Sequence, residues 1–111
     1  MIFLYLNSDK MGEGDSQLGK KLMRSFLSEL ATSGQTVDFI GCVNGGINLT
    51  TSGSEVLDSL KRLQENGATI ATCGTCLDFY NKRDTLVIGV IGTMDKTVAL
   101  MLNADKIIRP C

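Results

Sequence analysis

The sequence feature that most restricts the fold is a run of five apolar residues at positions 2–6, Ile-Phe-Leu-Tyr-Leu. A strand with one face in water alternates apolar and polar residues, whereas a strand buried on both faces of a parallel sheet is apolar throughout. Shorter strand-like runs follow at residues 37–43, 68–72, 86–91 and 106–109. We therefore predict five strands in a sheet that is covered on both faces.

A helical pattern separates the first two strands. Apolar side chains recur every four residues at Leu18, Leu22, Phe26 and Leu30, beside Met23 and Leu27, which predicts a helical stripe that Gly34 ends. Asp15 precedes the pattern and is placed to cap the first turn.

Three further helices are predicted between the later strands. Residues 52–55 match a capping box and predict a second helix, which Gly67 ends. A short third helix follows the third strand, with Thr75 and Asp78 as its capping pair, and Thr93 opens a fourth helix.

The alternation of strands and helices predicts a single three-layer α/β domain over residues 1–111, with a flavodoxin-like, five-stranded and mainly parallel sheet. We expect the strand order 2-1-3-4-5. Ligands bind such sheets at the carboxyl ends of the strands, where the winding direction reverses. The expected order puts that position between the first and third strands, so the loops at residues 7–15, 43–51 and 72–81 should form the site.

The composition removes several classes of function. The chain has no histidine, which excludes Ser-His-Asp and Cys-His catalysis and removes the commonest metal ligand. Eleven basic and twelve acidic residues form no long block of one sign, so we expect no nucleic-acid partner. No segment has the length or pattern of a membrane span or a signal peptide. We expect a cytoplasmic protein with reduced cysteines, no membrane partner and no cofactor.

Cys73 and Cys76 form a Cys-x-x-Cys motif where the third strand meets the third helix. Exposed backbone amides at the start of a helix stabilise a thiolate. We therefore expect Cys73 to be reactive and the helix amides to be directed at its sulfur. The alternative is that both cysteines are small buried apolar residues. A thioredoxin-like dithiol fits the spacing, but there the motif follows an early strand and faces a cis-proline, and the only proline here is Pro110.

A zinc site is a second interpretation of the same cysteines. It would need ligands from the remote Cys42 and Cys111, which is a poor set without histidine, and we predict no metal site. We expect Cys42 in the core and Cys111 at a mobile chain end. The third interpretation is that one nucleophilic cysteine accepts sulfur and becomes a persulfide. The second cysteine then assists the reaction or resolves the persulfide.

Two other sets of residues near the predicted site each allow two interpretations. Asn44, Gly45 and Gly46 form either an anion cradle of backbone amides or a simple turn. Lys82 and Arg83 either stabilise a sulfur anion or are solvated residues at a helix end. We do not include this basic pair among the catalytic residues.

Four ordered motifs together resemble the DsrE/DsrF-like sulfur-relay superfamily. They are MGEGD at 11–15, NGGINL at 44–49, CGTCLDFY at 73–80 and NADKIIRP at 103–110. The likeness spans essentially the whole chain and is strongest to the C-terminal domain of YedF-type proteins, which are sulfurtransferase-like and linked to selenium metabolism. It implies a flavodoxin-like sheet, homo-oligomers and a sulfur-carrying cysteine after the third strand, the position that Cys73 matches.

The sequence departs from the YedF-type pattern in two ways. Those proteins usually carry an N-terminal sulfur-carrier domain of the TusA kind, which residues 1–111 lack. The sulfur donor is then expected to be another protein. Asn81 also stands where a glycine is expected, and asparagine tolerates the left-handed conformation that such a turn requires.

The resulting hypothesis is a sulfurtransferase-like carrier of sulfur or selenium, with Cys73 and Cys76 as the catalytic pair. The residues expected to bind substrate are Asn44, Gly45, Gly46 and Thr75. The expected partners are sulfur-donor and sulfur-acceptor proteins, among them a TusA-like carrier, and further copies of the chain. The alternative is a non-catalytic module that binds a small ligand or a protein and whose cysteines are structural or redox-sensing.

Overall fold

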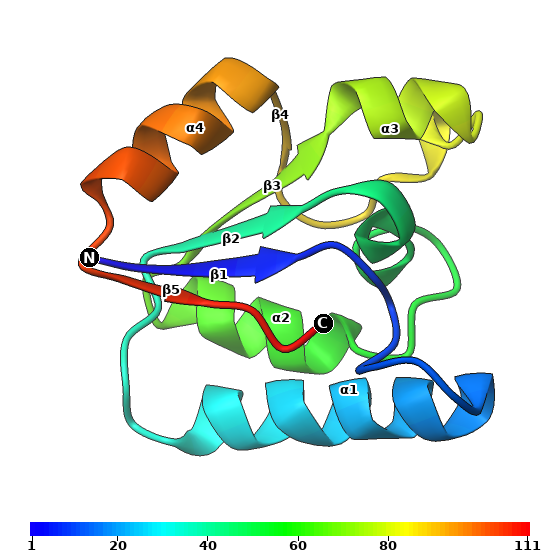
Figure 1. The fold of residues 1–111 in the computed structure, drawn as a ribbon, viewed down its shortest axis with the longest axis horizontal. Helices are drawn as coiled ribbons and strands as arrows, with labels where there is room; N and C mark the ends of the chain where they lie inside the picture. The colour runs from blue at the N-terminus through cyan, green and yellow to red at the C-terminus, as the bar shows by residue number, and fades with distance from the viewer.

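Five parallel strands form the centre of the computed structural model, which describes residues 1–111 (Figure 1). The strands are β1 (Ile2–Leu6), β2 (Phe39–Cys42), β3 (Thr69–Cys73), β4 (Val90–Gly92) and β5 (Lys106–Ile108). The α-helices are α1 (Ser16–Thr32), α2 (Leu57–Glu65), α3 (Gly74–Phe79) and α4 (Met94–Asn103). Two 3-10 helices are η1 (Asn44–Leu49) and η2 (Arg83–Thr85). The predicted α/β class and five-stranded parallel sheet are confirmed.

The strand order is β4-β3-β2-β1-β5, so the predicted order 2-1-3-4-5 is wrong. The first three connections each place the next strand beside the last one, in the same direction across the sheet. Only the connection through α4 returns across the sheet, and it puts β5 beside β1. The winding direction therefore reverses between β1 and β5, and not between the first and third strands.

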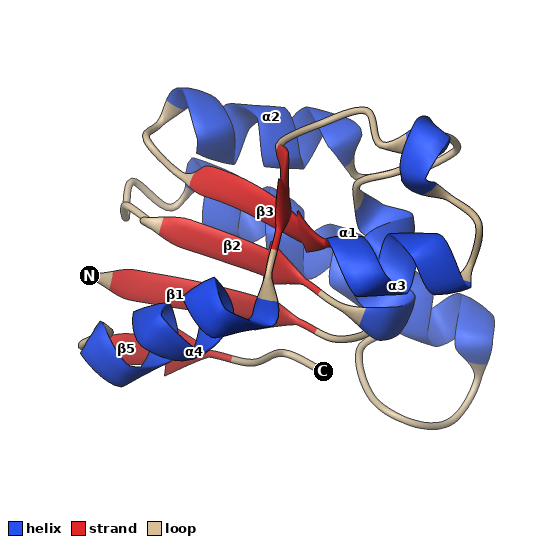
Figure 2. Ribbon diagram, turned by 90° about the horizontal axis from the view of Figure 1, so that it is seen from above, coloured by secondary structure: helices blue, strands red, loops and turns tan.

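The two faces of the sheet are covered unequally. Right-handed connections that run in one direction put their helices on one face, and a reversed connection puts its helix on the other. Accordingly α1 and α2 lie together under the sheet and α4 lies over the opposite face, with α3 at the carboxyl ends of the strands (Figures 1 and 2). The main core lies between the sheet and the α1 and α2 pair, and its fully buried members include Leu4, Leu27 and Leu60.

Helix α1 begins as predicted, and part of its predicted apolar stripe is buried. The Asp15 carboxylate accepts a hydrogen bond from the Leu18 N–H at 2.8 Å, which confirms the cap. Met23 and Leu27 are buried as predicted, whereas Leu18 and Leu22 are exposed. Phe26 and Leu30 pack against the core as partly buried residues. The buried face also includes Gly19 and Ala31, two small residues that a pattern of large apolar side chains does not reveal.

Helix α2 begins later than the predicted capping box. Its first residue is Leu57, and residues 52–55 form a turn before it, so the capping-box prediction is wrong. The Ser54 hydroxyl accepts a hydrogen bond from the Val56 N–H at 3.2 Å, and Glu55 pairs with Arg24 on α1 instead of capping a helix. The turn therefore connects α2 to α1 and lines a cavity described below.

No helix of the structure is both long enough and apolar enough to cross a membrane.

Candidate functional site

The carboxyl ends of the parallel strands bring three predicted loops together, although the predicted strand order is wrong. The segment after β1 approaches η1, where the Asn48 side-chain amide donates a hydrogen bond to Asp9 at 3.3 Å. The buried hydroxyls of Thr50 and Thr72 lie 2.7 Å apart and connect the end of η1 to the end of β3. A polar cleft of about 710 Å³ lies between the first loop and η1, and Asn44 and other residues of both segments line it.

The two cysteines of the motif lie at the start of α3. Cys73 is the last residue of β3 and the N-cap of α3, and Cys76 lies in the first turn of that helix. Both side chains are half-buried, and the neighbouring Cys73 contributes to raising the pKa of Cys76. The Cys73 sulfur accepts no capping hydrogen bond, so the prediction that helix amides point at it is wrong.

The directed amide comes instead from η1 and reaches Cys76. The Asn44 N–H donates to the Cys76 sulfur across 3.2 Å. Asn44 has a left-handed backbone with φ of 49°, a conformation that asparagine tolerates better than most residues. Its side-chain oxygen accepts a hydrogen bond from the Tyr80 hydroxyl at 2.6 Å, which fixes the residue from the other side. The residue predicted as part of an anion cradle therefore directs its amide at a sulfur atom.

Tyr80 is a member of this site that the sequence reasoning missed. It lies four residues after Cys76, and side chains four apart lie on the same face of a helix, so spacing alone contained a usable signal. Tyr80 also packs edge-to-face on Phe79, with ring centroids 5.1 Å apart. Both rings are exposed, at 45% and 81%, so an apolar surface adjoins the thiols.

The turn after α3 has the geometry expected at Asn81. Asn81 has φ of 54°, and its N–H donates to the Asp78 carbonyl while the Lys82 N–H donates to the Leu77 carbonyl. This pair of bonds is the Schellman arrangement that ends many helices. It turns the chain so that the Lys82 ammonium reaches the Asn48 side-chain oxygen at 2.6 Å.

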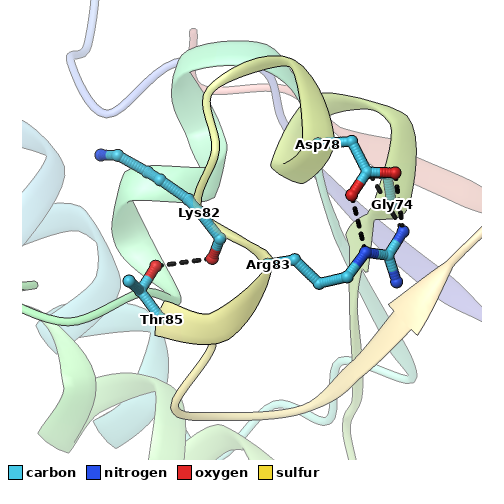
Figure 3. A network of polar contacts seen from close by, with 5 residues as sticks. All are labelled: Gly74, Asp78, Lys82, Arg83 and Thr85. Carbon is cyan, nitrogen blue, oxygen red and sulfur yellow. Dashed lines mark hydrogen bonds and ion pairs between the residues drawn. The ribbon is translucent and has the colours of Figure 1, made fainter.

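Lys82 and Arg83 point in opposite directions, as Figure 3 shows. Arg83 binds the Asp78 carboxylate at 2.7 Å and reaches the Gly74 carbonyl at 3.5 Å, so it folds back on α3. The hydrogen bond from Arg83 lowers the pKa of Asp78. This ion pair is solvent-exposed, and its role is to hold the surface of α3 rather than to contact either thiol.

The other residues predicted to bind substrate have different surroundings. Gly46 is buried, and its N–H donates to the Val43 carbonyl, so it belongs to the turn rather than to an anion cradle. Gly45 lines the cleft beside η1. Thr75 is exposed and lies inside α3, because Cys73 is the N-cap, so its prediction as a capping residue is wrong.

The remaining two cysteines lie outside the motif, at the end of β2 and at the C-terminus. Cys42 is 1% exposed, which confirms its predicted core position. Cys111 is half-buried, packs against the main core and lines the cleft, so the C-terminal residue has a defined place beside Cys42. No group of three or more His, Cys, Asp and Glu side chains is arranged to hold a metal ion.

The thiols differ in acidity for physical reasons. Burial raises the pKa of Cys42 to about 12, with a smaller rise from Cys111. Burial also raises the pKa of Cys76, and Cys73 adds to the rise, while the hydrogen bond from Asn44 acts in the opposite direction. At neutral pH both Cys42 and Cys76 are therefore protonated thiols.

We expect this order to appear in alkylation rates. Iodoacetamide reacts with thiolates, so Cys76 should react at pH 7 more slowly than an ordinary thiol with a pKa of about 8.5, and its rate should still rise above pH 9. Cys42 should stay unmodified until the protein is unfolded. Peptide mapping by mass spectrometry gives the rate for each cysteine. A Cys76 rate that levels off below pH 8 would contradict the raised pKa.

The arrangement of these strands and helices is an α/β fold shared with the YchN protein. The structure superimposes on the crystal structure of the YchN protein from E. coli with a TM-score of 0.72, 19% identity and 97% of each chain covered. It also matches a protein of unknown function, MTH1491 from Methanobacterium thermoautotrophicum, with a TM-score of 0.71, 18% identity and coverage of 98% of this chain and 97% of that one. The sequence matches no protein-family model and no curated protein. These likenesses concern the fold.

Proposed function

We propose that the protein carries sulfane sulfur as a persulfide on Cys73 and passes it to a partner protein. The observation that carries the proposal is the pair of half-buried thiols at the carboxyl end of β3, with the Asn44 amide directed at the second of them. Parallel α/β sheets bind their ligands at this edge. The exposed Phe79 and Tyr80 rings beside the thiols give a protein partner an apolar surface to contact.

The transfer has two balanced steps. The Cys73 thiolate attacks the outer sulfur of a donor persulfide, the donor S–S bond breaks, and the donor leaves as a thiolate. An acceptor thiolate then attacks the outer sulfur on Cys73, and Cys73 leaves as a thiolate. Selenium in place of the outer sulfur would follow the same steps, and the YedF-type resemblance makes it a candidate cargo.

Cys76 supplies a resolving step when no acceptor binds. Its thiolate attacks the Cys73 sulfur, forms a Cys73–Cys76 disulfide and releases hydrosulfide, which carries away the electron pair of the broken S–S bond. The raised pKa of Cys76 keeps it protonated at neutral pH, which slows this step and prolongs the life of the persulfide.

The test is incubation of the reduced protein with a cysteine desulfurase and cysteine, followed by mass spectrometry. We expect one added sulfur per chain, removable by a thiol reductant and located on the Cys73 peptide. A chain that stays unmodified while a known persulfide carrier in the same tube becomes labelled would contradict the proposal. That result would favour the alternative, a binding module with structural cysteines.

We also propose that the chain associates with further copies of itself through α4 and β4. Helix α4 has no buried residue, and Met94, Val98 and Leu102 form an exposed stripe along it. Val90 and Ile91 of the edge strand β4 are exposed as well, and contiguous exposed apolar patches mark interaction sites. Asp95 and Lys96 give this helix one negative and one positive charge. Two identical surfaces can therefore pair with opposite charges facing each other.

The association should depend on the stripe. We expect light scattering at micromolar concentration to give a mass above the 12.0 kDa of one chain, and Val98→Asp to return it to that value. Leu18→Asp is the matched control, because Leu18 is similarly exposed, at 54% against 48%, but lies on α1 under the opposite face of the sheet. A wild-type mass of one chain would overturn the proposal.

A further inference from the structure

A second cavity, distinct from the thiol site, lies between α1, η1 and the turn before α2. Its volume is about 280 Å³, and ten of its thirteen lining residues are polar or glycine. Lys20 and Arg24 line it from α1, Asn48 from η1, and Lys82 from the turn after α3. Four segments distant in sequence therefore contribute to one polar enclosure, to which the proposed sulfur chemistry assigns no role.

Two of the three cations that line the cavity form no ion pair with a carboxylate. The Arg24 guanidinium is paired with Glu55 at 2.7 Å, so these two charges cancel. The Lys82 ammonium donates one hydrogen bond, to Asn48, and keeps two further N–H donors. Lys20 forms no ion pair or side-chain hydrogen bond in the structure. Both lysines line the same cavity.

The remaining charge in the cavity is Asp9. Its carboxylate accepts a hydrogen bond from the Asn48 amide nitrogen, on the opposite end of the side chain from the oxygen that binds Lys82. Asn48 therefore holds Asp9 and Lys82 on its two ends. With the Arg24 and Glu55 pair neutral, Lys20 and Lys82 against Asp9 leave a net charge of +1 on the lining.

One hydroxyl of the turn can also donate into the cavity. The hydroxyls of Thr51 and Ser52 donate to the carbonyls of Ile47 and Thr85. The Ser54 oxygen instead accepts a hydrogen bond from the Val56 N–H, so its proton is available to a ligand. The enclosure thus offers ammonium and hydroxyl donors that lack acceptors, and an acceptor-rich anion would complement them.

We infer that this cavity binds a small tetrahedral oxyanion of the phosphate, sulfate or thiosulfate class through Lys20, Lys82 and Ser54. Such an anion presents only acceptor atoms, matches the spare donors and offsets the like charges of the two lysines. The inference goes beyond the sulfur-carrier proposal, because neither Cys73 nor Cys76 lines the cavity.

The test is a titration of the full chain, labelled with nitrogen-15, with phosphate, sulfate and thiosulfate at constant ionic strength kept by sodium chloride. We expect saturable shifts of the amides of residues 48 and 51–55 at millimolar anion. Lys20→Gln and Lys82→Gln should each weaken binding several-fold, and the double variant at least tenfold. Lys21→Gln is the matched control, because Lys21 is the exposed neighbour of Lys20 and does not line the cavity.

Additional experiments distinguish failure of the anion-binding inference from failure of the sulfur-carrier proposal. The titration repeated on Cys73→Ser should give the same affinity, since the cavity does not include the thiols. Loss of binding in Cys73→Ser would place the anion at the cysteines and overturn the inference, even if sulfur transfer were confirmed. Shifts that never saturate, or that Lys21→Gln reduces as much as Lys82→Gln, would show general screening only and would also overturn it.

Discussion

Cys73→Ser is expected to abolish sulfur loading, whereas Cys76→Ser is expected to keep it and to extend the lifetime of the loaded state. The proposed carrier sulfur is lost in the first variant, and a serine hydroxyl cannot form a persulfide. The second variant removes the thiol that resolves the persulfide by disulfide formation. Both substitutions change one atom, and both cysteines are half-buried at the start of α3, so the two variants control for each other structurally.

The measurement is the mass of the intact chain over time after the donor is removed. Wild type should lose the added sulfur as the Cys73–Cys76 disulfide forms and hydrosulfide is released, and Cys76→Ser should lose it more slowly. Circular dichroism and thermal melts establish that both variants fold. If Cys73→Ser still loads while Cys76→Ser does not, the carrier is the sulfur that accepts the Asn44 amide, and the assignment of the two roles reverses.

Among glycine-to-alanine substitutions near the site, Gly46→Ala should cause the largest loss of stability. A β-carbon at Gly46 would lie 2.1 Å from the Leu6 carbonyl oxygen and 2.9 Å from its carbon. Both are backbone atoms at the end of β1, so neither can move aside as a flexible side chain does. We expect the free energy of unfolding to fall by about 3 kcal/mol or more, at the upper end of overpacking effects.

Gly45→Ala is the matched control for this prediction. A β-carbon there would meet Ser8 no closer than 3.6 Å, which is ordinary van der Waals contact, and Gly45 has no left-handed backbone. We expect a change within about 1 kcal/mol, measured with wild type and Gly46→Ala by urea unfolding. Equal stability of the two variants would show that η1 is not held against the end of β1 as described.

The sequence predicted the elements better than their arrangement. The apolar run identified β1, and the residue type and position of Asp15 identified the cap, because each depends on a few neighbouring residues. The left-handed turn at Asn81 was expected from the family resemblance. The strand order depends on which strands pair across the whole chain, and no local pattern encodes the return of β5 to the side of β1. The buried face of α1 contains Met23 and Leu27, as predicted, but also Gly19 and Ala31, because small residues do not stand out in a pattern of large apolar side chains.

The site was predicted in part for the same reason. Parallel strands bring their carboxyl ends to one edge whatever their order, so the loops that meet there were correctly selected. The bond from Asn44 to Cys76 joins residues 32 positions apart and depends on a left-handed backbone in η1. The position of Lys82 beside Asn48 likewise follows from the turn at Asn81 together with the placement of η1. These contacts exist only once the sheet is assembled.

The donor of the hydrogen bond to Cys76 is the backbone N–H of Asn44. The bond therefore depends on the φ angle of that residue and not on the identity of its side chain. A glycine at position 44 could supply the same donor, because glycine adopts that conformation freely, and only proline would remove it. Distant relatives can therefore keep this polar environment for sulfur while their sequences diverge at that position. Comparison of backbone shape will recognise such relatives where comparison of residue types does not.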